Sequence, residues 1–256
     1  MPQIQMGKRV KNRCDAGDYV VSSAKTNAES VGADIEVRWG VIAGFMAGFL
    51  VKVIQWFAGI LEGSGKKLKQ KELDYVAELA DDIEPRKKRD EASAAAWNLI
   101  GSARSRIEQL QGDEGLKTYG LWEPVLQSPS EVAHRLTTTI EFLDKNPVTT
   151  ADPFGAVFDS TVVVDKLRAA LATLNEALAK VLTEERERQD ALNARDLAIE
   201  EWALAYQGVA SILSGLFLLA GRTDLSERLK PTIRRISGQE EVPIDETTTA
   251  PAEGGE

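Results

Sequence analysis

The stretch that decides the fold is 164–181, with the sequence VDKLRAALATLNEALAKV. Its apolar residues recur at alternating steps of three and four: Val164, Leu167, Leu171, Leu174, Leu178 and Val181. This spacing puts all six on one face of a helix and is typical of a heptad seam in a coiled coil. We predict a long helix whose seam packs in the core of a bundle; the alternative is a zipper between two chains.

The segment after this seam, 183–190, is entirely polar but contains neither Pro nor Gly. Glu184 and Arg188 are four residues apart, a pair that supports a helix. One interpretation is a single helix from about 160 to Gly221, a rod of roughly 90 Å at ~1.5 Å per residue. The other is a tight turn between antiparallel helices. The absence of turn residues favours the continuous helix.

The rest of the chain also reads as helical. The clearest helix start is Ser128–Glu131, where a capping Ser precedes Pro at the first helical position and Glu at the third. Clustered β-branched residues and two-residue hairpin turns are rare. We therefore expect an all-α protein of long antiparallel helices, near 23–61, 67–84, 88–111, 128–146 and 160–221, with a short helix after 224.

A weak internal duplication accompanies this pattern. Arg89 and Asp90 precede Trp97, much as Arg195 and Asp196 precede Trp202, and each apolar helix then ends in a Gly-containing stretch. The hypothesis is a duplicated helical hairpin.

One apolar segment, 39–61, reads WGVIAGFMAGFLVKVIQWFAGIL and is long enough to cross a bilayer. It has tryptophans near both ends and small or polar residues along one stripe of the helix. The candidate residues for helix packing or membrane contact are Trp39, Gly40, Gly44, Gly48, Lys52, Trp56 and Gly59. Such a glycine zipper allows close helix packing, in lipid or in a bundle core.

Two interpretations of 39–61 stay open, a membrane span and a buried helix of a soluble bundle. Lys52 weighs against the span, because a lysine near the bilayer centre costs on the order of 3 kcal/mol. If the segment spans, the lysines after it favour a cytoplasmic C-terminal bulk. A second uncharged segment, 202–221, more closely resembles a buried bundle helix.

The expected organisation has four parts. Residues 1–22 form a flexible N-terminal tail without the apolar run of a secretory signal, so classical secretion is not expected. Residues 23–62 form the apolar glycine-stripe helix, and residues 66–236 form the helical bundle domain. Residues 237–256, with six acidic residues and no Lys or Arg, form a disordered acidic tail. Cys14 is expected in the mobile N-terminal tail.

Composition excludes several classes of function. The chain has 256 residues, a net charge of −9, one Cys and one His. The negative charge argues against a nucleic-acid partner, and the lone Cys and His134 exclude thiolate zinc sites and His-rich metal centres. Phosphate-binding, dinucleotide-binding and nucleophile motifs are missing as well. We therefore identify no catalytic, cofactor-binding or metal residues, and no small-molecule substrate is evident.

These observations predict a non-enzymatic structural or interaction protein that self-associates or binds another helical protein, with the option of membrane attachment through 39–61. The alternatives are a soluble helical protein that inserts into membranes, as pore-forming proteins and translocators do, and an enzyme with a carboxylate site that spacing does not reveal.

Overall fold

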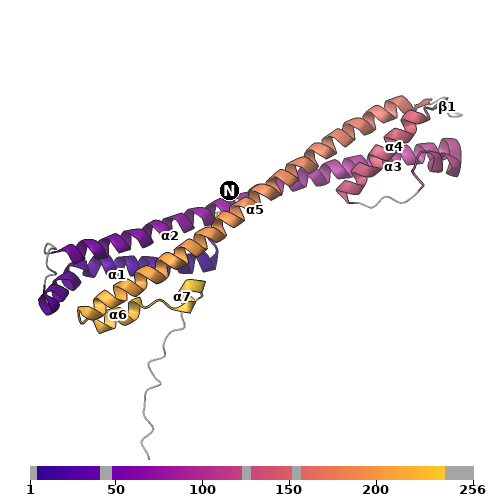
Figure 1. Ribbon diagram of the computed structural model, residues 1–256. Coiled ribbons are helices and arrows are strands. Elements are labelled where there is room, and N and C mark those ends of the chain that lie inside the picture. Colours follow the sequence, from indigo (N-terminus) through magenta and orange to yellow (C-terminus); the bar gives the residue numbers. More distant parts are fainter. Residues whose placement is uncertain (1–4, 41–47, 123–127, 152–156, 240–256) are drawn as a thin grey trace, which may run out of the picture. The chain divides into compact units, whose positions relative to one another are not determined.

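A computed structural model describes residues 5–40, 48–122, 128–151 and 157–239 (Figure 1). Most of these residues are helical, which confirms the all-α prediction. In chain order the elements are α1 (Lys8–Trp39), α2 (Phe49–Asp81), α3 (Ile83–Thr118), α4 (Pro129–Lys145), β1 (Thr149–Ala151), β2 (Val157–Asp159), α5 (Ser160–Leu219), α6 (Thr223–Leu229) and α7 (Ile233–Ser237).

The chain forms two compact units rather than an apolar helix of 23–62 followed by one bundle of 66–236. Unit 1 comprises residues 1–77 and 191–256, and unit 2 comprises residues 78–190. The boundaries differ from the expected ones because α5 is continuous: its first half packs in unit 2 and its second half packs in unit 1.

In unit 1, α1 and α2 are antiparallel neighbours, as their contacts show. The Gly7 amide donates to Glu72 at 2.8 Å, and the Lys25 ammonium meets Glu62 at 2.6 Å. Further along, Gly32 lies against Val51. The second half of α5 runs antiparallel to α2, because Lys67 pairs with Glu201 and the later Glu72 contacts the earlier Arg195 (Figure 1). It runs parallel to α1, because Gly17 lies against Trp202 and Trp39 contacts Leu219.

The core of unit 1 combines large aromatic residues on α5 with small residues on α1. Trp202, Tyr206 and Phe217 are fully buried, and the Trp202 and Tyr206 rings stack with centroids 4.9 Å apart. The Trp202 indole lies against Gly17, where an added Cβ would sit only 3.2 Å from the indole nitrogen. The small residues of α1 therefore let that helix approach the aromatic side chains closely.

Two short helices complete unit 1. Buried Ser214 of α5 and Ser226 of α6 bond to each other through their hydroxyls and backbone carbonyls at 2.8–3.0 Å. The segment around α7 returns to the start of α1, where Arg13 donates to the Ile236 carbonyl at 2.9 Å. The C-terminal part of the chain is thereby fastened to both α5 and α1.

Unit 2 packs α3, α4 and the first half of α5 around a leucine-rich core. Of the predicted seam, 164–181, Val164, Leu167 and Leu174 are buried in this core, and Leu171 and Leu178 pack against it partly buried. Val181 is buried as well but lies outside this cluster. The Ser128 hydroxyl caps α4 by accepting from the Glu131 amide, as the sequence indicates. α3 continues to Thr118 past the expected stop at 111, with a kink at Gly112, where φ is 64°.

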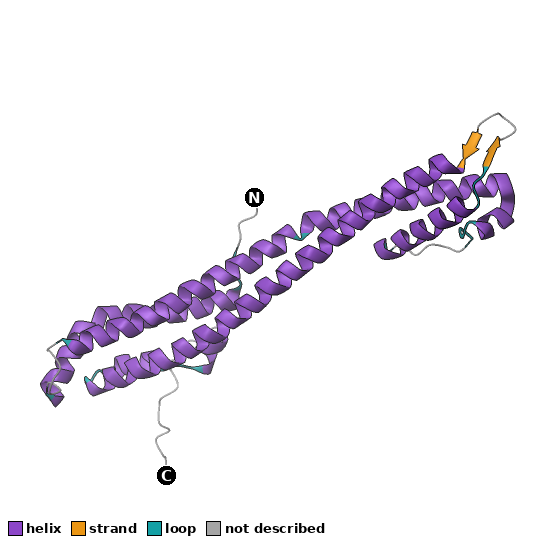
Figure 2. Cartoon of the chain, turned by 45° about the horizontal axis from the view of Figure 1, so that its top comes forward, coloured by secondary structure: helices purple, strands orange, loops and turns teal. Residues whose placement is uncertain are grey.

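A two-stranded antiparallel hairpin, which the sequence did not predict, lies between α4 and α5 in unit 2 (Figure 2). Thr150 pairs with Phe158, whose side chain is buried. Three-residue strands give too short a pattern of alternation to be read from the sequence alone. The Ser160 hydroxyl accepts from the Val148 amide at 2.9 Å and links the hairpin to the start of α5.

The flexible tail predicted for 1–22 is wrong from Lys8 onward, because α1 begins there. Its buried residues are small and lie between charged residues, so the segment looks polar in sequence: Val10, Cys14, Gly17, Val20 and Val21. Cys14 is buried rather than mobile, and burial, followed by the charges of Asp18 and Asp15, raises the pKa of its thiol.

The single helix expected over 23–61 is also wrong. α1 ends at Trp39 and α2 begins at Phe49, and the flanking Gly40 and Gly48 have φ near +80°, a conformation that glycine adopts without steric cost. The break expected at 62–65 is instead helical within α2. Leu61 and Leu68 are buried on either side of it, so packing outweighs the low helix propensity of Gly63 and Gly65.

The polar stretch 183–190 belongs to the continuous helix α5, so the interpretation without a turn is confirmed. The acidic tail was predicted for 237–256. Ser237 ends α7 and Gly238 caps it in the left-handed conformation, while residues 240–256 lie outside the described part of the chain.

Candidate functional site

The most unusual surface is at the end of unit 1 where α1 stops, α2 starts and α5 stops (Figure 1). Val37 is 85% exposed and Trp39 is 68% exposed, and three further large apolar side chains are exposed at the same end: Phe49, Leu218 and Leu219. We call these five residues the apolar end of unit 1. Several large apolar side chains exposed together are uncommon on soluble proteins and mark contact surfaces.

Three polar contacts hold the helices together at this end. The Trp39 indole N–H donates to the Leu219 carbonyl at 3.1 Å and joins α1 to α5. Glu36 accepts from the Gly48 amide at 2.9 Å and orients the start of α2. Asp34 pairs with Arg222 at 2.8 Å. The exposed apolar side chains are therefore presented by a fixed framework of α1, α2 and α5.

The predicted glycine stripe does not form along one helix. Gly40 and Gly48 lie outside the helices, with positive φ, and Gly44 lies outside the described residues. Lys52, Trp56 and Gly59 do share an exposed face of α2, and Trp39 lies at the end of α1. The structure thus brings the two ends of the predicted segment into one unit, but as parts of two antiparallel helices.

Among the described residues, α5 is the one helix long and apolar enough to cross a membrane by length and composition. Its apolar window is 39% buried, because Trp202, Tyr206 and Phe217 pack in unit 1. The outward face of the same half is exposed and uncharged, and consists of Leu204, Gln207, Gly208, Ser211, Ile212, Gly215, Leu218 and Leu219. This face leads along α5 to the apolar end.

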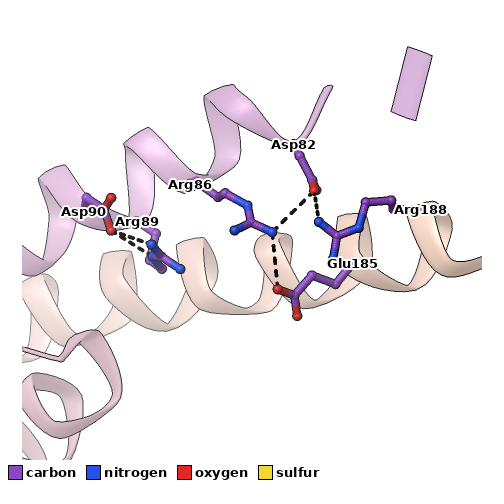
Figure 3. Close-up of polar contacts among 6 residues, drawn as sticks. All are labelled: Asp82, Arg86, Arg89, Asp90, Glu185 and Arg188. Carbon is purple, nitrogen blue, oxygen red and sulfur yellow. Dashed lines mark hydrogen bonds and ion pairs between the residues drawn. The ribbon is translucent and has the colours of Figure 1, made fainter. Parts of the chain in front are cut away.

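In unit 2, a group of paired charged residues lies between the start of α3 and α5 (Figure 3). Asp82, whose side chain is largely buried, accepts from Arg188 at 2.6 Å and from Arg86 at 3.4 Å. Arg86 also contacts Glu185 at 3.5 Å. Each charge in this group has an opposite charge beside it, which is the arrangement of a network that holds two helices together.

A second acidic group in unit 2 is the one that comes nearest to a metal site among the described residues. Oxygens of Glu78, Glu184 and Glu187 lie within 4.8 Å of one another. Glu184 already pairs with Lys180 at 2.9 Å, and this contact raises the pKa of the lysine. The group is thus partly neutralised from within the helix.

The described surface also contains open clefts. The one in unit 1 has a volume of about 730 Å³ and is lined by polar residues of α1 and by Arg228 and Arg235. Another, of about 860 Å³, lies between α3 and α5 in unit 2, with alanines in its floor and charged residues at its rim. His134, the only histidine, is exposed on α4 and away from both clefts.

Of the five residues of the apolar end, Trp39 was predicted from the sequence, whereas Val37, Phe49, Leu218 and Leu219 were not. The available signal was the lack of acidic residues from 37 to 61 and from 202 to 223, two segments whose proximity only the fold reveals. No protein-family model, curated protein or solved structure shows a significant match to this chain.

Proposed function

We propose that this chain is a non-enzymatic helical protein that attaches to the surface of a membrane through the apolar end of unit 1. The observation that carries the proposal is the joint exposure of Val37, Trp39, Phe49, Leu218 and Leu219 at one end of a helical bundle. Fully burying one such side chain away from water contributes about 1.5–3 kcal/mol. Two or three of them inserted together are sufficient for reversible attachment.

Sequence around the apolar end supports a lipid partner. No charged residue occurs in 39–51, and no acidic residue occurs in 37–61. Trp39 is exposed at the end of α1, and tryptophan favours the interface between lipid and water. These features match the side of a protein that lies in the headgroup region.

The geometry favours surface attachment over a span through 39–61. α1 and α2 are antiparallel, so the chain approaches this end and leaves it on the same side. Such an end inserts about 5–10 Å, as interfacial elements do, while the rest of unit 1 stays in water.

The test is co-flotation of the full chain with phosphatidylcholine vesicles and with vesicles that contain 30% phosphatidylglycerol. Replacing Val37 and Leu218 together by Asp places two charges in the apolar end without touching the core. We expect vesicle binding to fall at least tenfold, because each substitution loses the transfer energy of an apolar side chain and adds a charge.

The matched control is Ile233→Asp. Ile233 of α7 is 85% exposed, the same fraction as Val37, but it belongs to the segment that contacts the start of α1. The control should bind vesicles as the original chain does. The proposal fails if the original chain binds neither vesicle, if the double variant still binds, or if the control loses binding equally. Circular dichroism checks that both variants fold.

Self-association is a second candidate, favoured by the outward face of α5. An added Cβ at Gly208 or Gly215 would meet nothing within 4 Å, and Leu204, 74% exposed, lies on the same face. A second copy packed there would bury small and apolar residues without facing a charge. Light scattering would detect the dimer, and Gly215→Glu should return it to a monomer. A strict monomer at all concentrations would exclude this candidate.

A further inference from the structure

Two unpaired basic residues lie at the base of the apolar end. Arg38 is in the last turn of α1, next to Trp39, and Lys52 follows Phe49 by three residues in the first turn of α2. Both side chains are exposed. Among the described residues, neither forms an ion pair, and the Arg38 guanidinium lies directly beside Gly221.

The nearby acidic residues are already engaged. Asp34 pairs with Arg222 at 2.8 Å, and Glu36 accepts from the Gly48 amide at 2.9 Å. Along the chain, the next acidic residue after Glu36 is Glu62. Lys52 and Arg38 therefore have no carboxylate within their sequence neighbourhood that is free to neutralise them.

Three of the four other lysines on α2 differ in this respect, whereas Lys69 has no ion pair among the described residues. Lys66 pairs with Glu62 at 2.8 Å, Lys67 pairs with Glu201 at 2.5 Å, and Lys71 pairs with Asp74 at 2.9 Å. The chain has a net charge of −9, yet residues 34–61 and 202–222 together carry three basic and two acidic residues. These two segments therefore carry a net charge of +1, and Arg38 and Lys52 are their two basic residues without an ion pair among the described residues.

We propose that Arg38 and Lys52 bind the phosphates of anionic phospholipids, so that the apolar end selects anionic membrane surfaces. This inference rests on the proposed function and names its lipid class. When Trp39 and Phe49 enter the interface, the neighbouring basic side chains are at the height of the headgroups. Arginine can hold a phosphate with two parallel hydrogen bonds, whereas lysine acts as a point charge.

The expected effect follows from the electrostatics of an anionic surface. Each basic residue near such a surface strengthens binding about fivefold. The original chain should therefore bind vesicles with 30% phosphatidylglycerol about 25-fold more tightly than pure phosphatidylcholine vesicles. Raising the salt to 0.5 M should remove most of this preference, because ionic screening shortens the range of the attraction.

The decisive variant is Arg38→Gln with Lys52→Gln, which removes both charges and leaves polar, flexible side chains in their place. We expect it to lose most of the preference for phosphatidylglycerol and to keep its binding to phosphatidylcholine. The matched control is Arg9→Gln with Lys69→Gln. It also removes one arginine from α1 and one lysine from α2, at exposed positions near Gly7 and Glu72. The control should keep its preference for phosphatidylglycerol vesicles within about twofold. Its two residues lie near the opposite end of α1, more than a Debye length from the lipid surface, so their attraction to it is screened.

The outcomes separate the inference from the proposed function. Equal binding to both vesicles, or a preference that survives in the Arg38 and Lys52 variant, overturns the lipid selectivity and leaves attachment standing. Equal loss in the control variant overturns the assignment to these two residues. Competition by 10 mM glycerol phosphate would indicate a site for soluble phosphates and would also overturn it. If neither vesicle binds, the proposed function itself fails.

Discussion

The two halves of α5 have similar apolar cores but differ in the charge of their outer surfaces. In unit 2, residues 160–190 of α5 combine a leucine seam with eleven charged residues, all of which are at least partly exposed except Glu184. In unit 1, residues 202–219 bury Trp202, Tyr206 and Phe217 and carry no charge at all. The core requirement is similar in both halves, so the difference between their outer surfaces does not come from folding.

This contrast distinguishes surface residues that support the fold from surface residues that the fold does not require. Charged outer residues keep unit 2 soluble, and its ion pairs between α3 and α5 join the helices (Figure 3). An uncharged, exposed surface contributes nothing to the fold of unit 1 and exposes apolar side chains to water. Its presence at one end is best explained by a partner that removes it from water.

The largest effect that tests this contrast is loss of the aromatic core of unit 1. Trp202→Ala removes a fully buried side chain and should cost about 3–5 kcal/mol of unfolding free energy. Leu174→Ala, in the core of unit 2, should cost about 2–5 kcal/mol. Hydrogen exchange should increase mainly in α1 for the first variant and mainly in α4 for the second.

Trp202→Phe refines this prediction. The Trp202 indole N–H is buried and has no hydrogen-bond partner among the described residues. Phe removes that unsatisfied donor while keeping most of the ring volume, so it should cost clearly less than Ala. Equal costs for Phe and Ala in urea unfolding would contradict this expectation, because Phe keeps an aromatic ring and most of the apolar area and Ala keeps neither.

How much of this fold the sequence reveals depends on the size of the buried side chains. The seam 164–181 has leucines on one face, and the helix and its buried side were both predicted. The helix from Lys8 has only Val10, Cys14, Gly17 and similar residues on its buried side, so its periodicity is weak and it was taken for a tail. Small residues pack against large partners, and those partners are distant in sequence.

The candidate site shows a related limit. The apolar composition of 39–61, with Lys52 as its single charged residue, left a membrane span open, but hydropathy does not distinguish one long helix from two helices that meet at a turn. The glycines at 40 and 48 were assigned to a packing stripe, whereas their positive φ places them at helix boundaries. Leu218 and Leu219 join the site because the end of α5 packs beside the end of α1, as the contact between the Trp39 indole and the Leu219 carbonyl illustrates.

A smaller effect is expected from crowding the contact between α1 and α5. At Gly17 an added Cβ would lie 3.2 Å from the Trp202 indole nitrogen, so Gly17→Leu should destabilise unit 1 by about 1–3 kcal/mol. Gly101→Leu, on an open face of α3 in unit 2, should stabilise the chain by about 0.5–1 kcal/mol through helix propensity. Urea unfolding measures both, and a neutral Gly17→Leu would contradict the close packing.

The ion-pair network of unit 2 should contribute less. Asp82→Asn removes the carboxylate that accepts from Arg86 and Arg188, but both arginines are exposed enough to be hydrated. We expect a loss of about 1–2 kcal/mol. Asp90→Asn is the control, because its pair with Arg89 is at the surface and should be worth less than ~0.5 kcal/mol. Equal losses would show that burial of Asp82 has no special weight.

The smallest effect concerns acid stability of unit 1. Lys25 of α1 and Lys66 of α2 both donate to Glu62, and these contacts lower the pKa of the Glu62 carboxyl to about 2 from its ordinary value of 4.5. A carboxyl whose pKa is lower in the folded chain stabilises it at pH values above the unfolded pKa. That stabilisation falls as the pH drops from about 4.5 to about 2. Because Glu62 is solvent-exposed in this interaction, the contribution is small and decreases with salt.

Glu62→Gln should therefore lower the urea midpoint slightly at pH 7, and the difference from the original chain should disappear by pH 2. A difference that persists unchanged at pH 2 would mean that Glu62 acts through packing between α1 and α2 rather than through its charge.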